Sequence, residues 1–312
     1  MGIFKYSDDN KRYHTLNYYN KHTYGGRVHK AAINAGFTCP NIDGTRGSGG
    51  CVYCSGGSGY FTAKGIVSVA DQFNAEKARI REKYPDARIT AYFQANTNTY
   101  ASVERLYELY SEAIKAGADS ISVGTRADCI DSEKVEMISR LPVPVTVELG
   151  LQTVHDATAE LINRCHTYEE FLNGYNILRS YGIRVCVHII NGLPGENAEM
   201  MLDTAERLGK LHPDGVKIHL MHVISATRLA ELYRSGCYRP MEKEEYIDIV
   251  VRQLELLPAE TVIERLTGDG DRSTLIAPLW SIDKISVLGG IDKRMAQLDT
   301  WQGRLYREEH HA

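Results

Sequence analysis

Three cysteines in a glycine-rich loop are the residues whose type and spacing most clearly indicate chemistry. Cys39, Cys51 and Cys54 form the pattern C-x11-C-x2-C within residues 37–54. Two cysteines separated by two residues can bind one metal centre from a single turn, and the glycines at 47, 49 and 50 allow the loop to fold back so that the first cysteine joins them. The spacing alone leaves two interpretations open: a structural zinc site, which needs a fourth ligand, or an iron–sulfur cluster with one open iron.

The composition places these cysteines in a globular protein of a reducing compartment. Seven cysteines in 312 residues are too sparse for a disulfide scaffold, and the count is odd. Hydrophobic residues make up 43% and charged residues 24%, which excludes wholesale disorder and a fibrous protein. No apolar run approaches the ~20 residues of a membrane span, and the N-terminus shows no apolar region of a secretory signal. We therefore expect a cytoplasmic protein with no membrane partner.

Charge is distributed unevenly along the chain. A net charge of −4 and a pI of about 6.3 argue against a protein that coats nucleic acid indiscriminately. Residues 1–30, however, carry six basic side chains against two acidic ones, together with five tyrosines. Cations can contact phosphates and aromatic rings can stack on splayed bases, so the composition of this arm is compatible with an RNA partner. A solvated, packed arm without a ligand is the alternative.

Short β-rich segments alternate with helix-period segments over most of the chain. Strands are predicted at 31–37, 88–94, 120–124, 145–149, 183–191 and 215–222, and helices at 69–83, 103–116, 132–139, 168–181, 198–211 and 227–235. Gly117 and Gly182 each follow a predicted helix, as C-cap glycines do. Six strands alternating with six helices predict parallel pairing, in a doubly wound sheet or in a barrel or partial barrel. No G-x-G-x-x-G follows the first strand, which weakens the dinucleotide-binding version.

The elements divide the chain into three expected parts, an arm at 1–30, a core at 31–239 and a C-terminal extension at 240–312 that packs on the core. The cysteine loop directly follows the first predicted strand, so we expect it at the carboxyl edge of the sheet, where active sites of α/β proteins occur. The extension is predicted to contain helices at 243–257 and 283–297. Between them, residues 264–272 are too charged and too rich in glycine for the interior of an element.

An ordered set of motifs gives the chain a family resemblance. The segments are NAGFTCPN (34–41), GGCVYC (49–54), ELGLQT (148–153), NRCHT (163–167), GLPGE (192–196), KIH (217–219) and ERLTGD (264–269). Over nearly its whole length the chain resembles the radical S-adenosylmethionine (SAM) enzymes. It is most similar to the bacterial group labelled YhcC or YtqA, which is related to the elongator catalytic subunit and to oxygen-independent coproporphyrinogen oxidase. The first cysteine spacing is usually x3 in the wider superfamily; the x11 spacing departs from that and suits this group.

The resemblance implies a fold and two cofactors. The fold is α/β, a partial (βα)6 TIM-like barrel that forms the radical SAM core, with an N-terminal arm and a C-terminal helical extension. The cofactors are SAM and a [4Fe–4S] cluster ligated by Cys39, Cys51 and Cys54. The open iron would chelate SAM, and one electron from a reducing donor such as flavodoxin or ferredoxin would cleave SAM to methionine and a 5′-deoxyadenosyl radical.

The resemblance also implies positions that contact SAM. Tyr53 would pack on the adenine side and the loop at Gly192 would approach adenine, whereas the strand-end residues would contact the amino group, ribose and carboxylate; these residues are Gln94, Asn96, Thr97, Gln152, Arg164 and His188. The usual Gly-Gly-Glu after the second strand is missing here. Structural alternatives are loop packing for Tyr53, an ion pair for Arg164 and a core position for His188. Cys129 and Cys165 are candidates for a catalytic hydrogen donor.

The substrate that the resemblance implies is tRNA. The reaction would convert 5-carboxymethylaminomethyluridine at the wobble position to 5-aminomethyluridine, and a methyltransferase that acts on the product would be a downstream partner. The charged segment would line the mouth of the active site through Glu264, Arg265, Asp269 and Arg272, and an arginine there would bind a substrate carboxylate. An ion-paired loop is the structural alternative.

Two other functions remain open at this point. The chain could be a radical SAM enzyme that acts on a small metabolite or peptide, in which case cleavage of SAM would not depend on tRNA. It could also be a zinc-binding module that interacts with RNA, which would be colourless and contain no sulfide. His219 and His222 are three residues apart at the end of the sixth predicted strand, so they should not share one face of it, and a second metal site there is not expected.

Overall fold

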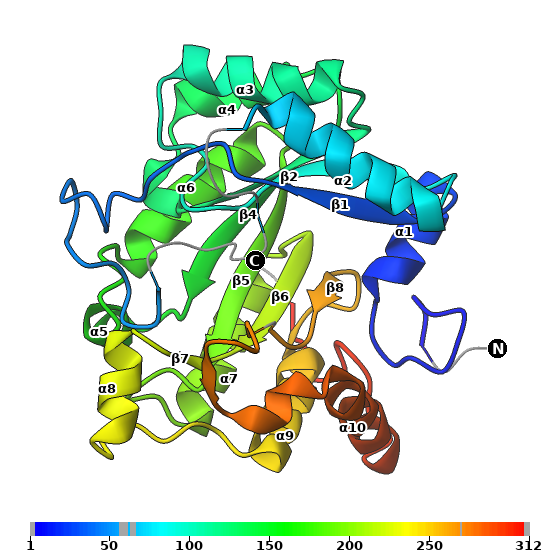
Figure 1. Ribbon diagram of the computed structural model, residues 1–312. Helices are drawn as coiled ribbons and strands as arrows, with labels where there is room; N and C mark the ends of the chain where they lie inside the picture. Colours follow the sequence, from blue (N-terminus) through cyan, green and yellow to red (C-terminus); the bar gives the residue numbers. More distant parts are fainter. Residues whose placement is uncertain (1–3, 56–61, 63–66, 269, 309–312) are drawn as a thin grey trace.

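Seven strands of this computed structural model form one curled, parallel sheet in the order β1-β2-β3-β4-β5-β6-β8 (Figure 1). The structure describes residues 4–55, 62, 67–268 and 270–308. The strands of the sheet are β1 (Val28–Ile33), β2 (Arg88–Phe93), β3 (Ser120–Thr125), β4 (Val145–Gln152), β5 (Arg184–Asn191), β6 (Gly215–Leu220) and β8 (Val262–Arg265). A separate antiparallel pair consists of β7 (Val223–Ile224) and β9 (Leu275–Ala277). Since β1 and β8 are the two edges, the barrel is partial and open between them.

Helices connect the strands and surround the outside of the sheet (Figure 1). They are α1 (Leu16–Tyr24), α2 (Val69–Lys83), α3 (Val103–Lys115), α4 (Ser132–Ser139), α5 (Asp156–Leu161), α6 (Tyr168–Ser180), α7 (Ala198–Lys210), α8 (Arg228–Arg234), α9 (Lys243–Leu256) and α10 (Lys284–Gln297), with short 3-10 helices η1 (Ala127–Cys129) and η2 (Leu279–Ile282). Within the described residues, no helix has both the length and the apolar character needed to cross a membrane.

Local sequence signals explain where the helices begin and end. The side chains of Ser68, Ser102 and Thr167 each accept a hydrogen bond from a backbone N–H in the first turn of α2, α3 and α6. Gly117 and Gly182 follow α3 and α6 with φ values of 91° and 69°, a conformation that lets the last carbonyls of these helices find donors. These capping residues fix the helix lengths and hence the points at which the chain re-enters the sheet.

The strands alternate between an apolar face and a polar face. Val147 and Leu149 of β4, like Val216 and Ile218 of β6, are fully buried in the core between the sheet and its helices. The residues between them point to the opposite side of the sheet because side chains alternate along a strand. On β4 that residue is Glu148. The inside of the curled sheet is therefore polar, which is where a site rather than a packed core is to be expected.

The expected fold class is confirmed, with differences in particular elements. β1 ends at Ile33 instead of residue 37, so an irregular stretch separates it from Cys39. The prediction that residues 264–272 lie outside regular elements was wrong for Glu264 and Arg265, which belong to β8. A charged residue is tolerated there because Glu264 is paired with cations of two other strands. α1 and α5 were not predicted.

The N-terminal arm packs against the C-terminal extension beside the open side of the barrel. Thr15 forms an isolated parallel bridge with Ile263 of β8, immediately before α1 leads into β1. His14 donates its backbone N–H to Gln302 Oε1 at 2.9 Å, and Arg12 pairs with Asp299 at 2.9 Å. In Figure 1 the blue arm accordingly lies next to the red α10. The arm thus helps to bridge the gap that the sheet leaves open.

Candidate active site in the partial barrel

The cysteine loop, residues 34–55, folds back on itself where it leaves β1. The carbonyl of Cys39 accepts a hydrogen bond from Ile42 N at 2.8 Å, and that of Cys51 accepts one from Cys54 N at 2.9 Å, so a tight turn begins at each of these two cysteines. Gly50 N donates to Asn41 O at 2.8 Å and joins the two halves of the loop. The backbone thus brings the distant first cysteine to the C-x2-C pair.

The three thiols of the loop influence one another electrostatically. Burial raises the pKa of Cys51 to about 11, and the thiols of Cys54 and Cys39 add to the rise. All three cysteines are half-buried and carry no disulfide. No three His, Cys, Asp or Glu side chains of the described residues gather closely enough for a single metal ion. Three thiolates are the donor set of a four-iron cluster with one open iron, and they are one fewer than the four ligands that a structural zinc site needs.

Asn163, which follows α5, holds the cysteine loop in place through hydrogen bonds. Its side-chain Nδ2 donates to Gly50 O at 2.8 Å and to Ser48 O at 3.1 Å. Its own carbonyl accepts a hydrogen bond from Asn41 Nδ2, and the same Nδ2 lies 3.6 Å from Cys51 Sγ. Asn41 is fully buried, so its amide has no access to water. The two asparagines therefore fix the backbone around Cys51 and direct an N–H group at its sulfur.

Among the described residues, several non-glycine residues near the cysteine loop and the strand ends have positive backbone φ angles. They are Asn96 (63°), Gln152 (62°), Asn163 (55°) and Cys165 (59°). Each such residue costs on the order of 1 kcal/mol or more, least for asparagine. Gly47 is required for a related reason: a Cβ there would lie 2.5 Å from Asn41 Oδ1 and 2.6 Å from Cys165 Sγ. Strain and close approach of this kind accumulate at functional sites.

A cavity of about 660 Å³ opens inside the curled sheet next to the cysteine loop. Five residues predicted to bind SAM or substrate line it, namely Tyr53, Gln94, Gln152, His188 and Arg265. Cys54 lines it as well, and so do Lys217, His219 and His222. The cavity is large enough for a ligand of the size of a nucleoside. The strand ends and the cysteine loop thus meet at one chamber.

Glu148 is the central charged residue of the barrel interior. Its side chain is fully buried, and its carboxylate accepts hydrogen bonds from residues of five other strands. These are Lys30 Nζ at 2.5 Å, Tyr92 Oη at 2.7 Å, Ser122 Oγ at 2.7 Å, His188 Nε2 at 2.9 Å, and Lys217 Nζ. Burial alone would raise the pKa of Glu148, but Lys217 and Lys30 outweigh it and hold that pKa well below the ordinary value. Glu148 is therefore an anion that holds the inner faces of the strands in register.

Glu264 of β8 is a second buried carboxylate of the same network. It accepts hydrogen bonds from Lys30 Nζ at 3.3 Å and from Arg184 Nη1 at 2.8 Å. Burial opposes the charged form, yet Lys30 and Arg184 lower the pKa of Glu264 to about 2. Glu264 is therefore ion-paired in the wall of the barrel and is absent from the described lining of the central cavity, unlike its neighbour Arg265.

The cavity contains three neutral imidazoles. Burial lowers the pKa of His188, of His219 and, to about 4, of His222. The rings of His188 and His219 lie 5.2 Å apart, and a Cβ at Gly268 would meet the rings of both His219 and His222 within 3.6 Å. His219 lies in β6 and His222 lies beyond its end at Leu220, and both line the cavity.

The other predicted SAM-binding residues support the loops. Arg164 is buried and donates to Thr153 O at 2.7 Å and His166 O at 3.0 Å; burial lowers its pKa. Asn96 donates to Phe37 O at 2.7 Å, and Thr97 donates its N–H to Thr38 O at 3.2 Å. Asn96 and Thr97 thus hold the first part of the cysteine loop, and Arg164 joins the segments that follow β4 and α5.

The remaining predicted residues are more widely spread. Cys129 is buried beside Arg126, and burial raises its pKa to about 12, whereas Cys165 packs against Gly47. Arg272 lines a separate cavity next to η2. Asp269 lies outside the described residues. The structure thus gathers only part of the predicted set around one chamber.

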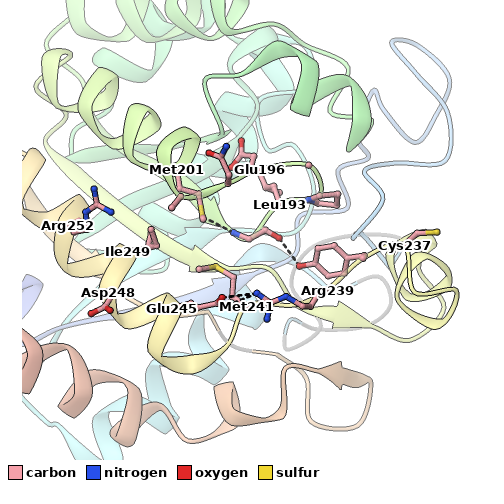
Figure 2. A pocket seen from close by; sticks show the side chains of 16 residues that line it. Leu193, Glu196, Met201, Cys237, Arg239, Met241, Glu245, Asp248, Ile249 and Arg252 are labelled. Carbon is pink, nitrogen blue, oxygen red and sulfur yellow. Dashed lines mark hydrogen bonds and ion pairs between the residues drawn. The ribbon is translucent and has the colours of Figure 1, made fainter.

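Gly192 lines a second cavity of about 530 Å³, between the loop after β5 and helix α9 (Figure 2). Gly192 N lies 3.3 Å from Met201 Sδ, and its carbonyl accepts a hydrogen bond from Tyr238 Oη at 2.7 Å. Figure 2 shows Arg239 paired with Glu245 at the rim, at 2.8 Å. The loop is thus fixed to α7 and to Tyr238, in the segment that directly precedes the C-terminal extension.

Sequence reasoning missed the residues at the centre of the polar network. Lys30, Glu148 and Lys217 each lie in the middle of a short apolar strand. A charged residue in the middle of an apolar strand is the sequence signal that could have identified them. When both faces of the sheet are covered, such a charge must be paired with an opposite charge. The motifs ELGLQT and KIH contain two of the three, but their partners can only be identified in the folded chain.

Comparisons with known proteins agree with this geometry. The profile of the Radical SAM superfamily matches residues 42–208, and that of the Radical_SAM C-terminal domain matches residues 213–297. The chain is 43% identical to YtqA of Bacillus subtilis over 309 residues, which cover 97% of this chain and 96% of YtqA. It is 35% identical to YhcC of Escherichia coli K12 over 274 residues, covering 86% of this chain and 88% of YhcC.

More distant matches are also found. A tRNA uridine(34) acetyltransferase of Methanocaldococcus jannaschii is 25% identical over 263 residues, which are 71% of this chain and 48% of that protein. Among solved structures, the archaeal Methanocaldococcus infernus Elp3 with an N-terminal deletion superimposes with a TM-score of 0.67 at 19% identity, covering 88% of this chain and 64% of that chain. The likeness to Elp3 concerns the fold.

Proposed function

The chain belongs to the radical SAM superfamily, in the subgroup of YtqA and YhcC, and we propose that it modifies the wobble uridine of tRNA. As a radical SAM enzyme it uses a [4Fe–4S] cluster and SAM. The proposed reaction converts 5-carboxymethylaminomethyluridine to 5-aminomethyluridine; SAM, converted to methionine and 5′-deoxyadenosine, accepts the two electrons, water supplies the oxygen, and the carboxymethyl group leaves as glyoxylate. The observation that carries the proposal is the central cavity, in which Cys54 and Tyr53 of the cysteine loop share a chamber with Lys217 and Arg265.

Cys39, Cys51 and Cys54 are the proposed cluster ligands. When bound, the cluster supplies one electron that cleaves SAM to methionine and a 5′-deoxyadenosyl radical. The loop itself keeps the thiols half-buried, and Asn41 and Asn163 fix the backbone on which they stand. A reductant is required, and a flavodoxin or ferredoxin is the proposed donor.

SAM is proposed to contact the lining residues Tyr53, Gln94, Gln152 and His188. Burial raises the pKa of Tyr53 well above its ordinary value, so its ring stays neutral beside Cys51 and can stack on a base. His188 is neutral and is oriented by Glu148, which accepts its Nε2–H. Asn96, Thr97, Arg164 and Gly192 are proposed to act on SAM through the loops that they hold.

The tRNA substrate is supported by relatives and by the N-terminal arm. The archaeal relative is named for uridine 34 of tRNA. In the arm, Tyr6 stacks on His14 with ring centroids 4.6 Å apart, and Lys5 lies 4.9 Å from the Tyr6 ring. Lys11, Arg12 and Lys21 are already paired with carboxylates, so a nucleic acid would meet chiefly the rings, Lys5 and the exposed Arg27, which lies 4.6 Å from the Tyr84 ring. A methyltransferase that acts on the freed amine is a proposed downstream partner.

Anaerobic reconstitution with iron and sulfide tests the proposal. The protein is supplied with SAM, dithionite and bulk tRNA from cells that lack it, and absorption near 400 nm, 5′-deoxyadenosine and tRNA nucleosides are measured. We expect a brown protein, tRNA-dependent cleavage of SAM and conversion of the carboxymethylaminomethyl nucleoside. The variants Cys39→Ala, Cys51→Ala and Cys54→Ala should each lose the cluster absorption, whereas the matched Cys237→Ala on an exposed turn should retain it.

Two outcomes would redirect the assignment. Cleavage of SAM without any change in tRNA would keep the radical chemistry and move the substrate to a small metabolite or peptide. A colourless protein that contains zinc and no sulfide would favour the zinc-binding module instead.

A further inference from the structure

We propose that a basic and aromatic surface at the amino-terminal edge of the sheet binds phosphates of the tRNA backbone. This surface, the edge patch, consists of three cations and two rings, namely Arg27, Lys83, Arg88, Tyr24 and Tyr84. The inference rests on the proposed function for the identity of the RNA. It names where the chain holds the tRNA apart from the wobble nucleotide.

The three cations come from separate segments that meet at one edge of the sheet. Arg27 directly precedes β1, and Arg88 is the first residue of β2. Arg88 donates its backbone N–H to Arg27 O at 3.0 Å, where the pairing of the two strands begins. Lys83 is the last residue of α2, which leads the chain back to this edge. Figure 1 shows the end of α2 next to the start of β1, on the side of α1.

The two rings hold the cations in place. Arg27 Cζ lies 4.6 Å and Lys83 Nζ 5.4 Å from the centre of the Tyr84 ring, and Arg88 Cζ lies 5.8 Å from that of Tyr24. These distances are within the range of about 6 Å for cation–π contacts. A contact with a ring face fixes the position of a cation but uses none of its N–H donors. The donors remain available to an anion.

The surroundings of Tyr84 favour a phosphate over a base as the group that is bound. The ring of His29 stacks on Tyr84 with centroids 4.5 Å apart and an interplanar angle of 17°, and Arg27 lies over the same ring. Tyr84 is therefore covered and offers little surface to a nucleobase. Burial lowers the pKa of His29, and Arg27 and Lys83 lower it further, as expected where positive charge is concentrated.

The cations of the edge patch lack carboxylate partners. Arg27, Lys83 and Arg88 are exposed, and among the residues that the structure describes none of them forms an ion pair. Glu82 and Asp86 lie in the same stretch of chain, are also exposed, and pair with none of the three. The patch thus presents fixed positive charge to solvent, and a chain of phosphates complements it.

The position of the patch fits a large ligand that also reaches the central cavity. The patch lies where β1 begins, whereas the cysteine loop follows the end of β1. A strand rises about 3.3 Å per residue, so the six residues of β1 separate the two sites by about 20 Å. A small metabolite in the cavity cannot span this length. An RNA can contact the patch with its backbone while one nucleotide enters the cavity.

Equilibrium binding of bulk tRNA to the reconstituted holoenzyme, without reductant, provides the test. The tRNA comes from cells that lack the protein, and Kd is measured from about 50 to about 200 mM salt. The triple variant Arg27→Gln/Lys83→Gln/Arg88→Gln should bind at least about tenfold more weakly at the lowest salt. It should also reduce the slope of log Kd against log salt by about 2 to 3, because each lost phosphate contact removes about one unit.

Matched variants separate the edge patch from a general effect of charge or of ring removal. Arg105→Gln/Arg140→Gln/Arg239→Gln changes the net charge equally by removing exposed arginines that are paired with carboxylates, and it should leave the Kd within about twofold. Tyr84→Leu keeps every charge but removes the ring that positions two cations, and it should weaken binding about threefold. Tyr107→Leu, exposed on α3, should not.

Steady-state kinetics and cofactor loading test whether the patch acts on RNA alone. In the triple variant the KM for tRNA should rise while kcat stays unchanged, because the patch lies far from the cavity. Arg27→Lys/Arg88→Lys keeps the charges and should keep most of the affinity for tRNA. Iron content and the affinity for SAM should equal those of the wild type. A parallel fall in either quantity would show a structural role and overturn the proposal.

Failure of this inference is distinguishable from failure of the proposed function. If the wobble uridine is converted but the triple variant binds tRNA like the wild type, the edge patch is wrong and the function stands. If tRNA binds through the patch but its nucleosides stay unchanged, the RNA surface stands and the reaction is wrong. If the wild type binds phosphatidylglycerol vesicles through the patch and does not bind tRNA, the proposal is overturned.

Discussion

Lys30 on β1 and Glu148 on β4 form an ion pair of 2.5 Å across the inside of the curled sheet. The same ammonium reaches Glu264 on β8 at 3.3 Å and so links both edges of the sheet to its middle strand. An open barrel has no backbone hydrogen bonds between its edge strands, and this charge network takes their place on the inner face. The residues that hold the partial barrel in shape therefore also form the wall of its cavity.

Removal of the central carboxylate should destabilise the fold strongly. Glu148→Ala leaves the ammonium groups of Lys30 and Lys217 buried without their anion, and we expect a loss of about 3–5 kcal/mol in the free energy of unfolding. Urea denaturation of the holoenzyme measures this loss. Glu136→Ala, which removes an exposed partner of Arg140, should change the value by less than about 1 kcal/mol. Equal stability of the two variants would contradict the assigned role of Glu148.

Stability should fall as the pH is lowered from 7.5 to 5. Burial lowers the pKa of His166 to about 3 and that of His222 to about 4, below the ordinary value of about 6.5 for an unfolded chain. Below about pH 6.5 the unfolded chain therefore binds protons that the folded chain does not. The contribution of each neutral histidine to the free energy of unfolding is complete above about pH 6.5 and decreases as the pH approaches the lower pKa of the folded state. Each histidine should account for about 2 kcal/mol between these pH values.

Denaturation profiles of the wild type, His166→Gln and His222→Gln at pH 7.5, 6.5 and 5 measure this effect. Each variant should show a shallower loss than the wild type. Parallel profiles for all three proteins would show that these histidines do not titrate on unfolding.

The hydrogen bonds from Asn163 to the cysteine loop should determine how much iron–sulfur cluster the protein retains. Asn163→Ala removes two hydrogen bonds to the loop, at 2.8 and 3.1 Å, and places alanine at a φ of 55°. We expect iron and sulfide per chain to fall by half or more after reconstitution. Asn163→Gly, which tolerates the backbone angle, separates the two contributions. Asn17→Ala, on the exposed side of α1, is the matched control and should load normally.

Asn41 should tune the reduction potential of the proposed cluster. Its Nδ2 lies 3.6 Å from Cys51 Sγ, and hydrogen bonds to ligand sulfur atoms stabilise the reduced state. Asn41→Leu and Asn41→Ser should both shift the midpoint potential to more negative values, measured by redox titration with electron paramagnetic resonance. The readout does not depend on substrate, and only variants with wild-type iron content are compared. An unchanged potential would show that the contact has no electronic effect.

Much of the architecture could be predicted because its signals are local. Six of the seven sheet strands and the helices from α2 onward, apart from α5, were predicted to within a few residues, since capping residues and apolar periodicity act within one or two turns. β8 was not predicted because the evidence for it is long-range. A short strand that contains Glu264 and Arg265 resembles a loop in sequence, and only the pairing of Glu264 with Lys30 and Arg184 explains why it is buried.

The sequence by itself determined the cysteine motif, the alternation of strands and helices and the family, because each is encoded in residue types at short spacing. The tertiary structure alone decided which polar residues share the cavity. Arg164 was expected to contact SAM, but it donates to backbone carbonyls. Glu264 was expected to contact the substrate, but it is paired with cations. Lys217, in contrast, lines the cavity beside the cysteine loop together with Arg265 and His188. The reason is physical. Burial makes every charge depend on its partners, and the partners of Glu148 come from five strands spread from Lys30 to Lys217.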